Sequence, residues 1–221
     1  TAFRREYVGP QPISTKRPAV SSGTYITDPA AGLSMTFDQQ GTVAASPYIP
    51  LDQRLEEEQG LTWRTPVLSQ PLTLNGPIAL HLVAASTATD TDWFAKVADV
   101  APDATQTIVS EGQLRASLRR LARGSTRRQP LEAMTTPEPL TPGTFYDYEI
   151  SIAPTAWQFA AGHQLQLRLT SYNMPNALPG TIAFNDSAPA TSAFVPLLPA
   201  TNTVRYGGED GTSLTLPVAS P

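Results

Sequence analysis

Hydrophobic and polar residues alternate over many short stretches of the chain, which is the pattern of a β-strand with one buried face. The alternation is cleanest over residues 165–170, where Leu165, Leu167 and Leu169 are separated by polar side chains. Similar runs occupy residues 33–37, 61–65, 78–85, 146–152, 203–206 and 213–218. In the run 78–85 both faces are largely apolar, so we expect a strand that is covered on both sides.

Periodicity alone leaves two stretches undecided. In residues 113–121, Leu114, Leu118 and Leu121 fit the spacing of a helix, but alternate positions also fit a strand. A short helix or a turn is equally compatible with residues 51–59, because Asp52 is suited to cap a first helical turn.

The first 23 residues lack any core-forming period and contain three prolines and several basic side chains. We therefore expect residues 1–23 to form an extended arm or linker. Residues 24–221 are expected to form one domain, with about ten short strands at intervals of about 8 to 12 residues.

Composition narrows the fold class. The chain has 221 residues and 22 prolines, about twice the usual share of proline. Because proline breaks helices and is tolerated at strand edges and turns, this density favours short strands joined by rigid turns. The sequence therefore predicts an all-β protein, with two antiparallel sheets packed as a β-sandwich of the jelly-roll type.

The charge balance limits the expected partners. The net charge is −4 and the isoelectric point is about 5.1, which gives no electrostatic reason to expect nucleic acid. There is no cysteine, so disulfides and thiolate zinc sites are excluded. No apolar run approaches the ~20 residues of a membrane span. We expect a soluble protein without a membrane partner and leave its compartment, cytoplasmic or secreted, open.

Serine catalysis would leave a recognisable motif in the sequence. A serine nucleophile needs a histidine base and an orienting carboxylate, and the usual elbow has the form G-x-S-x-G. No such elbow occurs in the sequence. His81 lies among apolar neighbours and is expected to be a hydrogen-bonded core or sheet histidine. His163 follows a glycine at the start of the cleanest strand and is expected to tie a loop to the sheet edge.

Four aspartates gather around the run 92–100, namely Asp90, Asp92, Asp99 and Asp103. Aspartate at strand ends commonly accepts backbone N–H groups in turns, and this is the favoured interpretation. Two alternatives remain open: a calcium site, because calcium prefers carboxylate oxygens, and a pair of catalytic carboxylates of the glycosidase kind. Apart from that calcium alternative, no cofactor is expected.

Two further groups of residues were weighed as binding surfaces. Six arginines lie within residues 115–128 without an interleaved aromatic residue, so a solvated face that pairs with acidic corners is favoured over a nucleic-acid site. Five aromatic residues at strand positions are expected to pack in the core: Trp63, Trp93, Phe94, Trp157 and Phe159. An exposed pair of them would instead stack on a sugar, which makes a carbohydrate-binding module the alternative function.

A family resemblance emerges from motifs that follow one another in order. The run D-T-D-W-F-A-K-V-A-D-V-A-P-D over residues 90–103 is followed by E-G-Q-L-R over 111–115. Other matching pieces are D-P at 28–29, D-Q-R at 52–54, T-P-V-L-S-Q-P-L at 65–72, N-G-P at 75–77, P-G at 142–143, A-P-T-A-W-Q-F-A-A-G-H at 153–163 and S-L-T-L-P at 213–217. Together they resemble the C-terminal β-sandwich of cocaine-esterase-like and X-prolyl dipeptidyl-peptidase serine hydrolases.

The resemblance implies a galactose-binding-like jelly roll, with a strand at 113–121. It also implies a non-catalytic accessory domain that packs on an α/β-hydrolase catalytic domain, fused or separate, helps to form the substrate cleft and supports homo-oligomers. By resemblance, Met35 and Phe37 are the candidates for substrate contact. Asp52, Arg54 and His163 carry structural family motifs. The Ser-Asp-His triad of the family belongs to the hydrolase domain, so this chain alone is not expected to cleave a bond.

Overall fold

The computed structural model describes residues 1–27, 59–171 and 199–219. The elements of this part are β1 (Ala2–Tyr7), β2 (Ser21–Thr27), β3 (Leu61–Arg64), β4 (Leu72–Ser86), β5 (Asp92–Val100), β6 (Gln106–Arg115), the 3₁₀ turn η2 (Ala116–Leu118), β7 (Tyr146–Phe159), β8 (Gln164–Thr170), β9 (Ala200–Tyr206) and β10 (Ser213–Val218). No helix in these ranges is long and apolar enough to cross a membrane.

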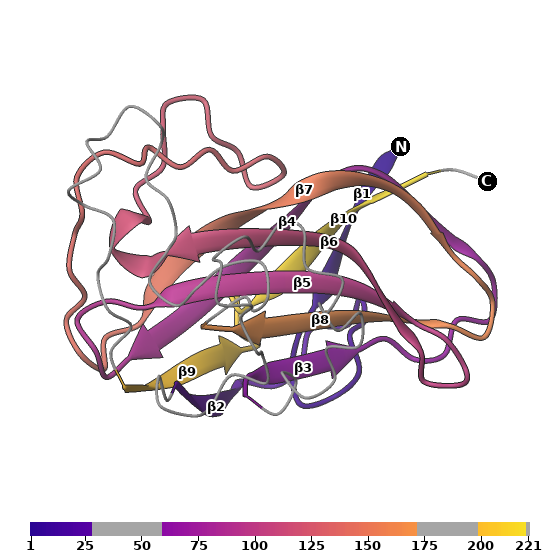
Figure 1. Ribbon diagram of the computed structural model, residues 1–221, viewed down its shortest axis with the longest axis horizontal. Helices are drawn as coiled ribbons and strands as arrows, with labels where there is room; N and C mark the ends of the chain where they lie inside the picture. The colour runs from indigo at the N-terminus through magenta and orange to yellow at the C-terminus, as the bar shows by residue number, and fades with distance from the viewer. Residues whose placement is uncertain (28–58, 172–198, 220–221) are drawn as a thin grey trace, which may run out of the picture.

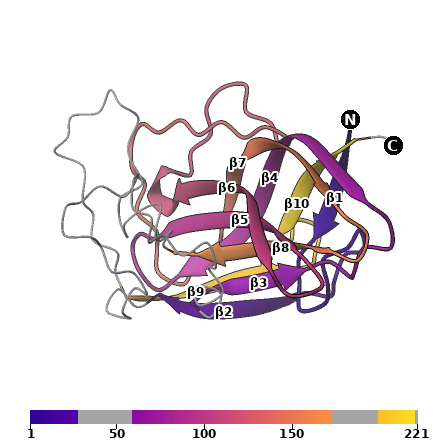
Figure 2. The same ribbon diagram turned by 45° about the vertical axis from the view of Figure 1, so that its right-hand side comes forward.

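The described strands form a two-layered, antiparallel body (Figures 1 and 2). One layer has the order β1-β10-β4-β7, with β9 and β2 continuing beside the end of β4, and the other has the order β6-β5-β8-β3. The layers meet at a single ladder pair between β6 and β7, Gly112 with Ile152. The predicted all-β sandwich is confirmed, whereas the jelly-roll connection order stays a prediction.

Side chains from both layers fill one core. Trp93 of β5 packs against Tyr148 of β7, with the ring centroids 5.4 Å apart. Leu80, Ile150 and Leu167 are at most 1% exposed and belong to the same cluster. Complete burial of a side chain of this size contributes about 1.5–3 kcal/mol to folding. Burial of the apolar side chains that alternate along each strand therefore supplies the main driving force for packing the two layers together.

Strand β4 is the longest strand of the described body and has a bulge near its start. The ladder to β7 shifts between Gly76 and Ile78, and Gly76 has φ +135°, which favours glycine because a side chain is strained there. Pro77 lies between them, where a missing N–H group is tolerated. Beyond the bulge, Ile78–Ser86 is buried on both faces, as the two apolar faces predicted.

The segment 1–23 differs from the expectation. Its first strand, β1, pairs with β10 over six residues, and Val8 and Ile13 are at most 1% exposed. It is therefore part of the sandwich rather than an arm or linker outside it. A strand pairs through its backbone, so β1 can join β10 without an alternating apolar pattern. Burial of Val8 and Ile13 is then sufficient to anchor the connection that follows β1.

The strand that the resemblance implies at residues 113–121 is present only as far as Arg115, and the expectation is wrong beyond that residue. Strand β6 continues to Arg115, and the next three residues form η2. Leu114 and Leu118 are both buried, so the apolar spacing was satisfied partly in strand and partly in a 3₁₀ turn. The expectations for residues 33–37 and for most of residues 51–59 fall outside the described residues.

Candidate functional site

Four strand ends meet at one end of the sandwich, at the left of Figure 1. Thr27, the last residue of β2, pairs with Ala200, the first residue of β9. Gly60, just before β3, lies so close to the carbonyl of Leu169 in β8 that a Cβ atom would clash. Ser171 follows β8 directly. We call these four positions, 27, 60, 171 and 200, the stem end, because residues 28–58 and 172–198 begin and finish there.

A buried hydrogen-bond network ties the stem end together. The side-chain amide of Asn202 donates to Thr27 Oγ1 at 2.9 Å and to Ser171 Oγ at 3.0 Å. Ser171 Oγ is also 2.8 Å from Tyr25 Oη and 3.4 Å from Thr91 Oγ1. All five side chains belong to buried residues. Buried polar groups are costly unless they are paired, so this network favours one fixed arrangement of the stems.

The first two aspartates brace the loop beside the stem end. Asp90 accepts hydrogen bonds from the backbone N–H of Ser117 at 2.9 Å and from its hydroxyl at 2.7 Å. Asp92 accepts two bonds from the guanidinium of Arg115, at 2.9 and 3.2 Å, and both side chains are at most 4% exposed. These contacts fix the 86–92 loop against η2, which is the turn chemistry favoured for these carboxylates.

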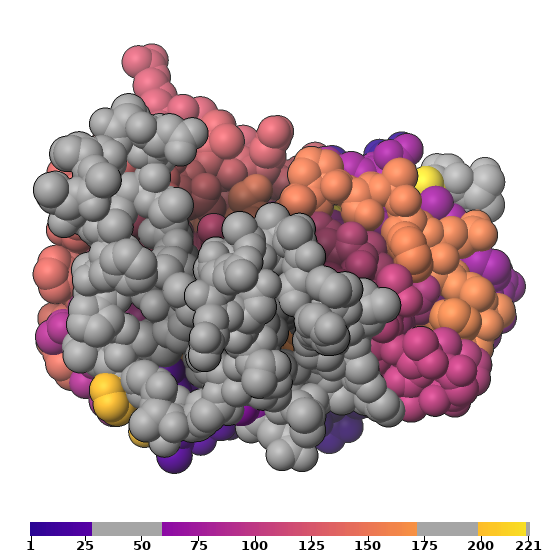
Figure 3. Space-filling model, viewed as in Figure 1, coloured from indigo at the N-terminus to yellow at the C-terminus, as the bar shows by residue number. Residues whose placement is uncertain are grey.

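The other two aspartates lie at the opposite end of β5. Asp99 accepts hydrogen bonds from Trp157 Nε1 at 3.0 Å and contacts His163 Nδ1 at 2.8 Å. Asp103 accepts the backbone N–H of Thr105 in the following turn, and this bond lowers the pKa of the Asp103 carboxyl. In Figure 3 this turn and the β7–β8 connection are adjacent at the right-hand end, and a Cβ atom placed on Gly162 would lie 3.6 Å from the Pro102 ring.

The four aspartates therefore do not converge on one point. Two of them serve the stem end and two serve the far end. In the described ranges, no group of three histidine, cysteine, aspartate or glutamate side chains is arranged to hold a metal ion. The oxygens of Asp90 and Asp92 are engaged by Ser117 and Arg115, which leaves neither carboxylate poised for acid–base catalysis.

Both histidines have structural partners. His81, 5% exposed, places Nδ1 at 2.8 Å from Glu149 Oε1 and donates from Nε2 to the carbonyl of Asp210 at 3.1 Å. His163 joins β5 through Asp99, and its carbonyl accepts the N–H of Leu68 from the loop before β4. Within the described residues, no hydroxyl group hydrogen-bonds to either imidazole, so neither histidine has a nucleophile beside it.

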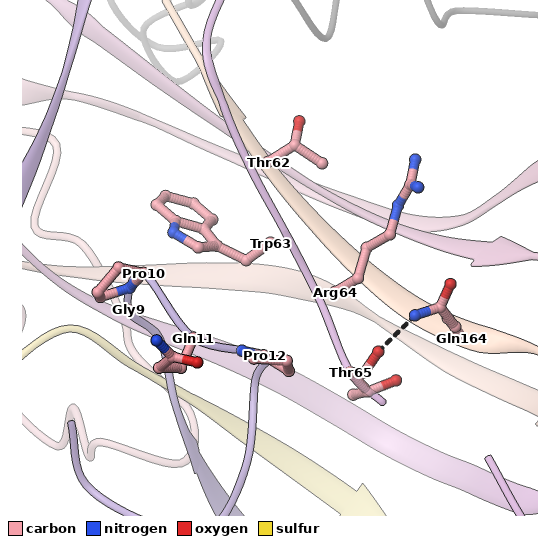
Figure 4. A pocket seen from close by; sticks show the side chains of 9 residues that line it. All are labelled: Gly9, Pro10, Gln11, Pro12, Thr62, Trp63, Arg64, Thr65 and Gln164. Carbon is pink, nitrogen blue, oxygen red and sulfur yellow. Dashed lines mark hydrogen bonds between the residues drawn. The ribbon is translucent and has the colours of Figure 1, made fainter. Parts of the chain in front are cut away.

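A pocket of about 440 Å³ lies between the edge of β3 and residues 9–12 (Figure 4). Gln164 closes one wall by donating to the carbonyl of Thr65 at 2.6 Å. Trp63 contributes one ring edge, but it is only 7% exposed because it packs against Tyr206. Besides Trp63, the lining consists of proline, amide and hydroxyl groups and the guanidinium of Arg64, without a catalytic pair, so it is a surface recess of the scaffold.

Sequence reasoning located some of these residues and missed others. Met35, Phe37, Asp52 and Arg54 all lie in residues 28–58, outside the described residues. The stem-end network was missed because its members lie far apart in the chain. The available signal was polar residues at the ends of apolar strands, such as Thr27 directly before the D-P motif.

The aromatic residues expected in the core are found there in four of five cases. Trp63, Trp93, Phe94 and Phe159 are buried, and the indole of Trp157 is half-buried and bound to Asp99. These five residues therefore present no exposed pair on which a sugar ring could stack. No observation on the described residues favours the carbohydrate-binding alternative.

Comparison with known proteins agrees with the all-β fold. Cocaine esterase of Rhodococcus sp. (strain MB1 Bresler) is 26% identical over 207 residues, which are 90% of this chain and 32% of the esterase. An aminopeptidase structure from a marine sediment archaeon (Thaumarchaeota archaeon) has a TM-score of 0.75 at 22% identity, over 100% of this chain and 37% of that one. An α-amino acid ester hydrolase structure has a TM-score of 0.75 at 22% identity, over 98% of this chain and 36% of that one.

The chain thus spans about a third of the length of each of these hydrolases. The family model that matches it is described as the X-Pro dipeptidyl-peptidase C-terminal non-catalytic domain, and the match covers residues 6–215. A match over nearly the whole chain, on an all-β scaffold whose histidines face no nucleophile, places it in one family: the chain belongs to the C-terminal non-catalytic domains of X-Pro dipeptidyl-peptidase and cocaine-esterase-type hydrolases.

Proposed function

We propose that this chain is the accessory domain of a serine hydrolase and packs on an α/β-hydrolase catalytic domain. The observation that carries the proposal is the family match over residues 6–215, together with relatives that are about three times longer than this chain. The reaction of such a parent is acyl transfer to a serine, with cleavage of an ester, an amide or an X-prolyl peptide bond. The accessory domain contributes shape rather than chemistry.

The proposed contribution is one wall of the substrate cleft, delivered from the stem end. Binding residues commonly lie in loops that a rigid scaffold positions. Residues 28–58 are held at both ends by such a scaffold, because Thr27 and Gly60 are fixed against β9 and β8. Met35 and Phe37 within this segment are the proposed contacts to the acyl or side-chain group of the substrate. Apolar contacts of this kind select substrates by size.

The test is a pair of alanine substitutions, Met35→Ala and Phe37→Ala, in the intact hydrolase that carries this domain. Because one buried methylene is worth about 1–3 kcal/mol in an apolar pocket, we expect kcat/KM for long-chain p-nitrophenyl esters to fall about tenfold or more, while the acetate ester is hydrolysed as before. Ile26→Ala is the matched control, because Ile26 is an apolar side chain on β2 that is 69% exposed. Equal effects on long and short esters, or an equal effect of the control, would remove the cleft role.

A further inference from the structure

Strand β1 presents a basic and aromatic row on its outer face. Phe3, Arg5 and Tyr7 alternate with inward-facing residues and lie opposite Pro217, Thr215 and Ser213 of β10. Among the described strands, β1 pairs with β10 alone. On its second backbone edge, Tyr7 exchanges two hydrogen bonds with Ser14, so within the described residues this edge lacks a ladder partner only before Tyr7. Both ribbon views show β1 beside β10 (Figures 1 and 2).

Two further arginines from other parts of the chain stack on this row. The guanidinium of Arg17 lies 5.3 Å from the centroid of the Tyr7 ring, and its Nη2 donates to Tyr7 Oη at 3.4 Å. The guanidinium of Arg128 lies 5.1 Å from the centroid of the Phe3 ring. A guanidinium on a ring face keeps its N–H edge directed away from the ring, so the aromatic rings orient these cations without neutralising them.

The cations of the row have no acidic partner within the described residues. Arg5, Lys16, Arg17 and Arg128 are all exposed, and none of them forms a salt bridge with a described carboxylate. Other basic residues do form such pairs: Arg115 with Asp92, Arg119 and Arg120 with Glu138, and Arg127 with Asp210. Four exposed positive charges without a salt bridge to a described carboxylate are unusual for a chain with a net charge of −4.

The nearest acidic groups do not neutralise the row. Glu6 is on the inward face of β1 and pairs with Arg4. Glu209 and Asp210 attract Arg17 without forming a salt bridge to it, and Asp210 is engaged by Arg127 at 3.2 Å. The pKa of the Tyr7 hydroxyl is lowered, mainly by its hydrogen bond with Arg17 and to a smaller extent by Arg5. Such a lowering is expected where positive charges gather. Next to Tyr7, Lys16 and Arg17 line a recess of about 330 Å³.

We propose that this row, Phe3, Arg5, Tyr7, Lys16, Arg17 and Arg128, binds an extended acidic polypeptide segment of a partner. Side chains on one face of a strand repeat every two residues, about 6.7 Å apart, and the acidic side chains of an extended segment that alternates acidic and neutral residues have the same spacing. Carboxylates match the guanidinium edges in both charge and geometry. The part of the β1 edge before Tyr7, which has no ladder partner among the described residues, also accepts an added strand.

Stacking distinguishes this partner from nucleic acid. Proteins that bind single strands offer free ring faces to the bases, whereas Arg17 and Arg128 already cover faces of Tyr7 and Phe3. This inference is independent of the cleft role, because it concerns β1 and not the stem end.

The test uses the whole chain and a short fluorescein-labelled peptide that alternates glutamate and threonine, with fluorescence anisotropy as the readout. We expect saturable binding at low ionic strength that weakens when salt is raised to about 0.15 M. The same peptide with glutamine in place of glutamate is expected not to bind. The triple variant Arg5→Gln, Arg17→Gln, Arg128→Gln should weaken binding about tenfold, since exposed ion pairs contribute modestly and roughly add.

Arg123→Gln is the matched control, because Arg123 is also exposed and belongs to the same β6–β7 connection as Arg128. It should change affinity less than twofold. If the triple variant unfolds at a lower temperature, Arg5→Gln alone decides, with an expected loss of about threefold. Equal loss in the control, equal binding of the glutamine peptide, or tighter binding of an oligothymidylate than of the acidic peptide would each overturn the proposal.

Discussion

At the scale of single residues, His81 shows how one side chain joins distant parts of the chain. It lies on β4 and contacts Glu149 of β7 and the carbonyl of Asp210 in the β9–β10 connection. The other charged groups that face this cluster are Asp147, 3.6 Å from Nε2, and Arg127, 3.6 Å from the Glu149 carboxylate. Burial of His81 acts to lower its pKa. The hydrogen bond to Glu149 and the negative charge of that carboxylate outweigh this effect, so the pKa of His81 is raised.

This raised pKa predicts a pH dependence of stability. A histidine whose pKa is higher in the folded than in the unfolded chain stabilises the fold fully below about pH 6.5, its unfolded value, and loses that contribution as the pH rises through the folded pKa. We therefore expect His81→Gln to lower the free energy of unfolding by roughly 1–2 kcal/mol near pH 6 and by less near pH 9.

Urea unfolding of both proteins across this range measures the difference. His163→Gln provides the comparison, since His163 is the second histidine of the chain. A difference for His81→Gln that stays constant or grows with pH would contradict a stabilising imidazolium at this position.

At the scale of elements, the crossing of β6 and β7 controls how the two layers join. The only ladder pair between these two described strands is Gly112 with Ile152. A Cβ atom at position 112 would overlap the carbonyl oxygen of Ser151 and lie 2.9 Å from the Cα of Ile152. The layers can approach this closely because the crossing residue has no side chain.

We expect Gly112→Ala to destabilise the protein by about 1–3 kcal/mol, the usual range for overpacking. Thermal or urea unfolding measures the loss, and amide exchange should localise it to β6 and β7. Gly124→Ala is the comparison, because no atom lies within 4 Å of its would-be Cβ and only its φ of +91° opposes a side chain. A smaller loss at Gly112 than at Gly124 would show that the close crossing does not limit the packing.

The elements also show what the sequence could predict. Strands with regular alternation, such as β8, were identified because burial of one face imposes a period of two. β1 was missed because its place depends on backbone pairing with β10, more than 200 positions away. The junction of β6 and η2 was undecided because the leucine spacing satisfies both periods.

For the candidate site too, the sequence could predict some features and not others. The turn role of Asp90 and Asp92 follows from their position at a strand end, so it could be predicted. Their partners Ser117 and Arg115 could not, because they are 23 or more residues away along the chain. The same holds for the stem-end network, in which Asn202 and Thr27 are 175 positions apart.

At the scale of the whole molecule, the chain is a scaffold with two differently equipped ends. The far end is closed by short turns held by Asp99 and Asp103. The stem end instead anchors two long segments on a buried polar network. The cleft role proposed above depends on this difference, because residues 28–58 begin and end at the stem end.

The most direct test of this division of labour is reconstitution of activity. The 221-residue chain and a catalytic α/β-hydrolase domain of the same family would be purified separately and assayed, alone and mixed, with p-nitrophenyl esters and Ala-Pro-p-nitroanilide. We predict no turnover by this chain alone, no labelling of it by a fluorophosphonate probe, and a complex in size-exclusion chromatography whose substrate preference differs from that of the catalytic domain alone. Turnover or covalent labelling of this chain, or a mixture that forms no complex and leaves the preference of the hydrolase unchanged, would contradict the account.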